Sequence, residues 1–324
     1  MRRLSLCIAI AAAALVVAPS ALADGPLGVI QGGSGVSSHA RPNLHYVAIA
    51  DRYGTLLETI NVRTGAVWSW NRVSGAWGVP AVGIDQSGEG LSRDGRTLVL
   101  ADPTRLYASP SKFLVVDARP LQVIRTISLD GSFSFDALSP DASRLYLIQY
   151  ASANDQSHYI VRAYDMQTNR LLPGKIADRS EEEEEESMAG TAITRATSAS
   201  GRWVYTLYQK PSGEPFVHAL DTKRAVAHCI DLPANPRAYN IALSLRDGGR
   251  TLAADWRRTG RPWLSVDVGS SWQISYPSGG RFPWAWLAAG IVGGIAVLSA
   301  GGLLLWRRRG EDAKEQTRQE LGLA

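Results

Sequence analysis

A phrase made of a polar turn and an apolar run occurs four times in this chain of 324 residues. It reads LSRDGRTLVL from Leu91, LSPDASRLYLI from Leu138, TSASGRWVYTL from Thr197 and LSLRDGGRTLAA from Leu243. The arginines that close the turns, separated by 48, 58 and 48 residues, are Arg96, Arg144, Arg202 and Arg250. A unit repeated every 40 to 50 residues or so cannot bury its apolar faces alone, so several copies must stack around a shared core.

A second landmark follows each turn, an aspartate at the end of an apolar run. The four aspartates are Asp117, Asp165, Asp221 and Asp267. A tight turn and another apolar run follow each of them, so each unit is predicted to hold four short strands. A degenerate first copy has Asn61 in place of the aspartate. We expect the first copy to open with LGVIQGG, from Leu27, and the next copy to open with PAVGIDQSGEGLS, from Pro80.

The turn and the later aspartate resemble the WD40-like family of bacterial propellers, in particular those of the YVTN type. LSPDASRLYLI with IVRAYDMQTNRLL matches the family pattern most closely, and LSRDGRTLVLAD with FLVVDARPLQVI nearly as well. The resemblance spans residues 26–277 and implies an all-β fold, a β-propeller of about five four-stranded blades. Ser200, in place of the turn aspartate, and Asn61 depart from the pattern. A pair of β-sandwiches is the alternative fold, and the resemblance implies no particular activity.

The two ends of the chain carry targeting signals rather than further blades. Residues 1–23 hold two arginines, an apolar stretch and an Ala-Leu-Ala site, as in a secretory signal peptide; an uncleaved anchor is the alternative. Residues 282–306 carry no charge, have tryptophans near both ends, and precede three arginines. These features predict an extracytoplasmic propeller domain, 24–280, then one transmembrane α-helix and a short cytoplasmic tail, 307–324.

Small residues form a stripe along the predicted membrane helix. They are Ala289, Gly290, Gly293, Gly294, Ala296 and Ala300. Such a stripe lets two helix backbones approach closely, so we expect contact with a membrane protein partner or with a second copy in a homodimer. The general frequency of glycine in membrane helices is the alternative explanation.

Charge and cysteine content limit the partners and the bonds that the chain can have. Between the two terminal segments, 27 basic residues stand against 26 acidic ones, and such a near-neutral body argues against a nucleic-acid partner. The acidic run within 179–187 falls in the one long interval between turns, so we interpret it as a solvated loop insertion. Removal of the leader leaves Cys229 as the single cysteine, which we expect to be a buried strand thiol.

The sequence contains no local motif for catalysis or for a cofactor. It has no G-x-S-x-G elbow and no phosphate-binding loop between a strand and a helix. The five histidines, none with the spacing of a metal site, are His39, His45, His158, His218 and His228. We therefore predict no metal and no cofactor.

Two groups of residues are candidates for surface contacts. Trp68 and Trp70 share one face of a short predicted strand, and Trp77 is near in sequence. Aromatic side chains of this kind stack on sugar rings or anchor a peptide, although packing between blades explains them as well. The last unit has three arginines in a predicted hairpin within 257–261, for which anionic headgroups and solvent are the two interpretations.

Two functions remain open. The first is a single-pass, membrane-anchored extracytoplasmic propeller that acts as a non-catalytic binding or scaffold module of the cell envelope, with a glycan or peptide ligand. The alternative is a membrane-anchored propeller enzyme, a hydrolase or lyase acting on envelope polysaccharide. Titratable side chains that converge at one mouth of the central channel would favour the enzyme.

Overall fold

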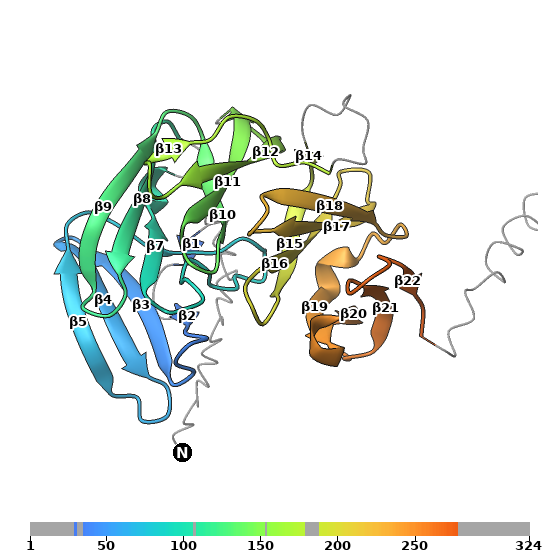
Figure 1. Ribbon diagram of the computed structural model, residues 1–324, viewed down its shortest axis with the longest axis horizontal. Coiled ribbons are helices and arrows are strands. Elements are labelled where there is room, and N and C mark those ends of the chain that lie inside the picture. The colour runs from blue at the N-terminus through green and yellow to red at the C-terminus, as the bar shows by residue number, and fades with distance from the viewer. Residues whose placement is uncertain (1–28, 31–34, 106–107, 153, 179–187, 278–324) are drawn as a thin grey trace, which may run out of the picture.

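The computed structural model describes residues 29–30, 35–105, 108–152, 154–178 and 188–277 (Figure 1). These residues fold almost wholly into antiparallel β-sheets. Among them there is no α-helix, and the three short 3-10 turns are η1 (Pro103–Arg105), η2 (Ala238–Asn240) and η3 (Asp247–Gly249). Figure 1 shows the sheets following one another around a common centre.

The first two sheets come from residues 36–129. In the first sheet each strand pairs with the next along the chain: β2 (Val36–Ser37), β3 (Leu44–Asp51), β4 (Gly54–Asn61) and β5 (Val67–Val73). The second sheet follows the same order: β7 (Thr97–Ala101), β8 (Ser111–Asp117) and β9 (Gln122–Leu129). Runs of β-branched and aromatic residues between tight turns favour such strands.

The opening strands of these two sheets differ from the sequence expectation. β1 (Val29–Ile30) pairs with β6 (Val79–Pro80) rather than with the first sheet, which β2 opens instead. The segment expected to open the second sheet is irregular after β6, and Leu91 forms only a single bridge to Leu98. Three glycines interrupt this segment, and glycine in a strand weakens it because it has no side chain to pack.

The other three sheets repeat one plan. The third is β10 (Phe133–Leu138), β11 (Arg144–Ser152), β12 (Asp155–Asp165) and β13 (Arg170–Leu171), with β14 (Met188–Ala189) beside β12. The fourth is β15 (Thr191–Thr197), β16 (Trp203–Gln209), β17 (Pro215–Asp221) and β18 (Val226–Asp231). The fifth is β19 (Ile241–Arg246), β20 (Thr251–Trp256), β21 (Pro262–Asp267) and β22 (Ile274–Ser275).

Each sheet has the form of a propeller blade. Its strands are hydrogen-bonded in chain order, with the first strand toward the common centre and the last on the rim (Figure 1). Consecutive antiparallel sheets of this kind are the architecture of a β-propeller, so the predicted resemblance to WD40-like propellers is confirmed. The five sheets are called blades from here on, numbered in chain order.

The repeated phrase is the turn between the first and second strands of a blade, and in the second, third and fourth blades a serine hydroxyl organises it. In the third blade, Ser139 Oγ accepts a hydrogen bond from the backbone N–H of Arg144 at 2.9 Å and donates one to Asp141 at 2.8 Å. Ser92 and Ser198 accept the equivalent backbone hydrogen bond, each at 2.9 Å. The phrase recurs because each blade needs this turn.

The aspartate that ends the third strand of a blade shapes the next turn in the same manner. Asp165 Oδ1 accepts hydrogen bonds from the backbone N–H groups of Gln167 and Thr168 at 2.8 and 2.9 Å. In the first blade the amide oxygen of Asn61 accepts a hydrogen bond from the N–H of Arg63 at 3.0 Å. An amide oxygen can make this bond as a carboxylate does, so the departure from the pattern leaves the fold intact.

Hydrophobic clusters join neighbouring blades. One cluster joins the first and second blades, another runs from the second through the third to the fourth, a smaller one joins the third and fourth, and one joins the fourth and fifth. Buried apolar area of this kind supplies most of the free energy of folding. Tyr146 in the third blade is fully buried, and its hydroxyl donates to the carbonyl of Thr222 in the fourth at 2.7 Å.

Several predicted segments lie outside the described residues. They are the signal peptide, the acidic insertion at 179–187, the membrane helix at 282–306 with its small-residue stripe, and the tail. In the part of the chain that the structure describes, no helix has the length and hydropathy that a membrane crossing requires.

Candidate functional site

A loop between β6 and β7 crosses from the second blade to the fourth. The backbone N–H groups of Ile84 and Asp85 donate to the carbonyls of Ala192 and Ile193 on β15, at 3.1 and 3.3 Å. The pairing of β15 with β16 is shifted by a β-bulge at this place. Bulges of this kind re-aim a strand and are frequent beside functional sites. The loop then returns to the second blade, where the carbonyl of Gly90 accepts a hydrogen bond from β7.

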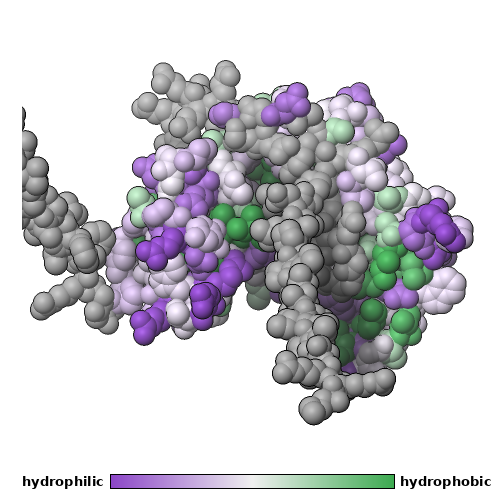
Figure 2. All heavy atoms as spheres, turned by 180° about the vertical axis from the view of Figure 1, so that it is seen from behind, coloured by the Kyte–Doolittle hydropathy of each residue, from purple (hydrophilic) through white to green (hydrophobic). Residues whose placement is uncertain are grey.

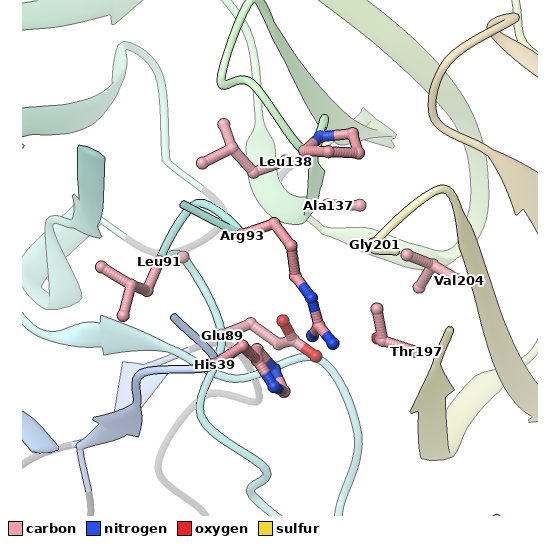
Figure 3. Close-up of a pocket in the computed structure, with 11 residues that line it drawn as sticks. His39, Glu89, Leu91, Arg93, Ala137, Leu138, Thr197, Gly201 and Val204 are labelled. Carbon is pink, nitrogen blue, oxygen red and sulfur yellow. The ribbon is translucent and has the colours of Figure 1, made fainter. Parts of the chain in front are cut away.

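A small pocket opens where the returning loop meets the repeated turns of the first four blades. The residues that line it are His39, Glu89, Gly90, Leu91, Arg93, Ala137, Leu138, Pro140, Thr197, Gly201 and Val204. Figure 3 shows the carboxylate of Glu89 and the guanidinium of Arg93 directed toward the same space. We call this space the mouth pocket, because it lies at the end of the propeller that the repeated turns form.

Loss of hydration perturbs the charged groups of the mouth pocket. Burial raises the pKa of the Glu89 carboxyl, although the nearby charge of Arg195 opposes the effect. Burial also lowers the pKa of the Arg93 guanidinium. Partial burial, and then the charge of Arg93, lowers the pKa of His39. Desolvation is the first cause in each case, while Glu89 and Arg93 are partly buried and His39 is exposed.

Two polar atoms of the mouth pocket are buried and have no hydrogen-bond partner among the described residues. They are Nη1 of Arg93 and Oγ1 of Thr197. A buried polar group that stays unpaired costs about 1–3 kcal/mol, and native proteins rarely leave one without a reason. A guanidinium, a hydroxyl and the Glu89 carboxylate together suit a polar ligand that presents both acceptors and donors.

A buried ion pair between the third and fourth blades lies close to Glu89. The side chains of Asp136 on β10 and Arg195 on β15 are each 2% exposed, and Arg195 Nη2 lies 2.5 Å from Asp136 Oδ1. Arg195 Nε donates to the hydroxyl of Thr206 at 3.0 Å. The other carboxylate oxygen of Asp136 has no hydrogen-bond partner within the described chain. This pair holds two inner strands together and adds charge to the electrostatic field at Glu89.

A polar row continues from this ion pair across the fourth blade. The strand register aligns Arg195, Thr206, His218 and Cys229 on one face of the sheet. His218 is 1% exposed, and burial lowers its pKa. His228 falls on the other face, so the two strand histidines do not meet. Within the described ranges, no three His, Cys, Asp or Glu side chains are placed to hold a metal ion.

The three tryptophans predicted as a contact surface separate into two environments. Trp68 and Trp70 are 70% and 66% exposed on β5, the rim strand of the first blade. Trp77 is 7% exposed, and its indole Nε1 donates to the carbonyl of Ser74 at 2.7 Å. Figure 2 shows further hydrophobic surface on the side of the molecule that the first two blades form. A ligand role stays a prediction for Trp68 and Trp70, whereas Trp77 packs in the core.

Sequence reasoning missed the residues of the mouth pocket and of the ion pair. Arg93 falls inside the repeated phrase, which predicts only a turn there. Glu89 falls in a segment expected to be a strand. One signal was present: Ser38, Ser92 and Ser139 occupy equivalent places in three turns, and the residues after them all line the mouth pocket. Two of those following residues are His39 and Arg93, and side chains of this kind are unnecessary for a turn.

Comparison with known proteins gives likeness in fold alone. No protein-family model and no curated protein matches the chain. It is similar to the β-propeller domain of Cps50 (Swd1) from Myceliophteria thermophila, with 12% identity over 77% of this chain and 73% of that one, and a TM-score of 0.46. It is also similar to hydrazine synthase from Kuenenia stuttgartiensis, with 11% identity, 77% and 66% coverage and a TM-score of 0.46. It is similar as well to TolB from Acinetobacter baumannii, with 12% identity over 76% of this chain and 54% of that one, and a TM-score of 0.44.

Proposed function

We propose that this chain is a single-pass, membrane-anchored, extracytoplasmic propeller that binds a polar ligand in the mouth pocket. The observation that carries the proposal is the pair of buried, unpaired atoms, Arg93 Nη1 and Thr197 Oγ1, beside a desolvated carboxyl group. Hydrogen bonds to a charged partner contribute about 1.5–3 kcal/mol each, so a ligand that pairs with these groups would gain affinity from each bond.

The chemistry of the pocket indicates the class of ligand. The guanidinium of Arg93 can only donate hydrogen bonds, and the ionised carboxylate of Glu89 can only accept them. The hydroxyl of Thr197 can donate or accept. Hydroxyl-rich sugars and the polar groups of a peptide present both kinds of group at short spacing. The rest of the wall is small or apolar, as at Ala137 and Leu138, so the polar contacts available to a ligand are concentrated at Glu89, Arg93 and Thr197.

The anchoring part of the proposal rests on the sequence. The leader at 1–23 and the uncharged segment at 282–306, followed by three arginines, place the propeller outside the cytoplasm.

Binding to a glycan and peptide array tests the ligand site. The labelled full-length protein, held in lipid nanodiscs, would be compared with its Arg93→Gln and Arg96→Gln variants. Arg96 is a matched control because it belongs to the same turn, with its side chain 66% exposed. We expect the array signal of the wild type to fall at least tenfold in Arg93→Gln and to persist in Arg96→Gln. Equal signals from all three proteins would place the binding site elsewhere.

The enzyme alternative gains one specific observation. Titratable groups, His39, Glu89 and Arg93, do converge at one mouth of the propeller, and burial raises the pKa of Glu89 as in a general acid. However, hydrolysis of a glycoside commonly uses two carboxylates, and Glu89 is the only one among the described residues that line the pocket. Binding is therefore the better-supported function. If the protein released reducing ends from an array glycan and Glu89→Gln abolished that release, the enzyme would become the better-supported function.

The membrane helix supplies the second part of the proposed role, contact with a membrane partner or a second copy. The small residues Gly290 and Gly294 would let another helix approach closely. Replacing both with leucine is expected to abolish the cross-linked species that the full-length protein forms in membranes. Unchanged cross-linking in the double variant would remove the helix contact from the proposal.

A further inference from the structure

The chain leaves the fifth blade at one defined end. Ser265 pairs with Ser275 and Val266 with Ile274, so β22 runs antiparallel to β21 and heads toward the start of β21. The hairpin that precedes β21, residues 257–261, lies at that end. We call this the exit end of the blade. The repeated turn of the fifth blade, before Thr251, lies at the opposite end.

Exposed arginines and tyrosines surround the exit end. The set, which we call the basic corner, consists of Arg237, Tyr239, Arg257, Arg258, Arg261 and Tyr276. Tyr239 and Tyr276 are 50% and 49% exposed. The connection from the fourth blade is held beside the hairpin, because the N–H of Arg257 donates to the carbonyl of Asn240 at 2.7 Å.

Two arginines of the basic corner have side chains that form no polar contact with the described part of the protein. Arg257 donates to the carbonyl of Ile241 at 3.0 Å and lies 3.6 Å from Asp85, so it has a structural role. The side chains of Arg258 and Arg261 are exposed and form no hydrogen bond or ion pair within the described residues. At this end of the neighbouring fourth blade, the carboxylate of Asp231 has a different basic neighbour, because the ammonium of Lys210 lies 3.7 Å from it.

We propose that the basic corner binds anionic lipid headgroups of the bilayer in which the chain's own helix is anchored. The inference rests on the proposed membrane anchor and adds the orientation of the propeller. Four residues, 278–281, lie between Pro277, the last described residue, and Phe282, where the predicted helix begins, which makes five Cα-to-Cα steps. Extended chain covers at most about 3.6 Å per residue, so the exit end stays within about 18 Å of the helix.

The distance of about 18 Å is an upper limit, and any less extended link brings the exit end within range of the headgroups. The headgroup region adds about 5–8 Å on each side of the hydrocarbon core, and charges act over a Debye length of about 8 Å in physiological salt. Arginine pairs with phosphate through a planar fork, and tyrosine is favoured at the membrane interface. The basic corner combines both residue types next to the tether.

The orientation has a consequence for the ligand site. The mouth pocket belongs to the end of the propeller that carries the repeated turns, and the exit end of the fifth blade is the opposite one. When the basic corner lies on the bilayer, the mouth pocket faces away from it. Ligands would then reach Glu89 and Arg93 from the extracytoplasmic space rather than from the membrane.

Quenching of a site-specific fluorophore by spin-labelled headgroups tests the inference. The full-length protein, with Cys7 and Cys229 replaced by serine, would carry the fluorophore at Thr259→Cys, on the tip of the hairpin. A matched probe at Lys223→Cys, an exposed turn at the opposite end of the fourth blade, serves as the control. Nanodiscs of phosphatidylcholine alone would be compared with nanodiscs that contain 30% phosphatidylglycerol, both with the same spin-labelled lipid.

We expect quenching at Thr259→Cys to be at least twofold stronger with phosphatidylglycerol, and to return to the lower level in Arg258→Gln/Arg261→Gln or in 0.5 M salt. Quenching at Lys223→Cys should stay weak throughout, and the circular dichroism spectrum of each variant checks that the fold is retained. Quenching at Thr259→Cys that is weak in both lipids, or equal in both, would overturn the inference. Extraction of the chain by alkaline carbonate would instead overturn the anchor itself, so the two failures are distinguishable.

Discussion

The inner strands of the propeller and the rim strand of its first blade distribute polar and apolar side chains in opposite ways. β10 and β15, near the centre, bury Asp136 and Arg195, each with its side chain 2% exposed. β5, on the rim, exposes Trp68 and Trp70 at 70% and 66%. Folding alone favours the reverse, because burying charge is costly and exposed aromatic surface gains nothing from the core. The contrast places polar chemistry at the centre and apolar contact at the rim.

Removing one member of the buried ion pair is expected to have the largest effect. Asp136→Leu leaves the guanidinium of Arg195 buried without its carboxylate, and such a loss typically costs about 3–5 kcal/mol of the free energy of unfolding. Urea denaturation, followed by circular dichroism, measures the change. The double variant Asp136→Leu/Arg195→Met removes both charges and should recover most of the loss. A double variant as unstable as the single one would show that the loss does not come from the unpaired charge of Arg195.

The turn serine beside the mouth pocket should have a smaller effect. Ser139→Ala removes the acceptor for the N–H of Arg144 and the donor to Asp141, and one such hydrogen bond contributes about 0.5–1.5 kcal/mol. We expect a loss of about 1 kcal/mol in urea denaturation. Ser212→Ala, on an exposed hairpin of the fourth blade, is the matched control and should change stability by a few tenths of a kcal/mol. Equal losses at both positions would contradict the capping role of Ser139.

Local turn chemistry explains how much of the fold is visible in the sequence. The turns of the second, third and fourth blades share a serine because its hydroxyl accepts the same backbone hydrogen bond in each, so the phrases around Ser92, Ser139 and Ser198 revealed the blades. The segment between β6 and β7 follows a different rule. Its backbone bonds to β15, more than a hundred residues away, and no local pattern can record such a pairing.

The candidate site was hidden for the same reason. Glu89, Arg93 and Thr197 belong to the second and fourth blades and meet only when the propeller assembles. The alternation of residues along a strand predicts which side chains share a face of the sheet. It does not predict that a polar side chain on that face pairs with a buried residue of the neighbouring blade. The local sequence therefore does not distinguish Arg195 from the other residues of its strand. Residues that differ between equivalent repeat positions, such as His39 and Arg93, are the signal that sequence reasoning can use in similar chains.

The pH dependence of stability distinguishes the desolvated carboxyl at the mouth from the charges buried behind it. Burial raises the native pKa of Glu89, so the native state holds its proton to a higher pH than the unfolded chain does. Its contribution is present below the unfolded value, about 4.3, and is lost as the pH rises through the raised native value. Glu89→Gln should therefore flatten the decline of stability with rising pH over that window, measured by urea denaturation at several pH values. An unchanged pH profile would mean that Glu89 is hydrated in solution.

The rim is expected to show the smallest effect on folding. Trp68 and Trp70 are exposed on an edge strand, and surface substitutions usually change stability by no more than about 0.5 kcal/mol. Trp68→Ala/Trp70→Ala should therefore unfold at nearly the wild-type urea concentration. Trp77→Ala, in the core between the first two blades, is the matched control and should lose about 3–5 kcal/mol. A loss above about 2 kcal/mol in the rim variant would show that these rings pack against the protein and are no free surface for a glycan or peptide.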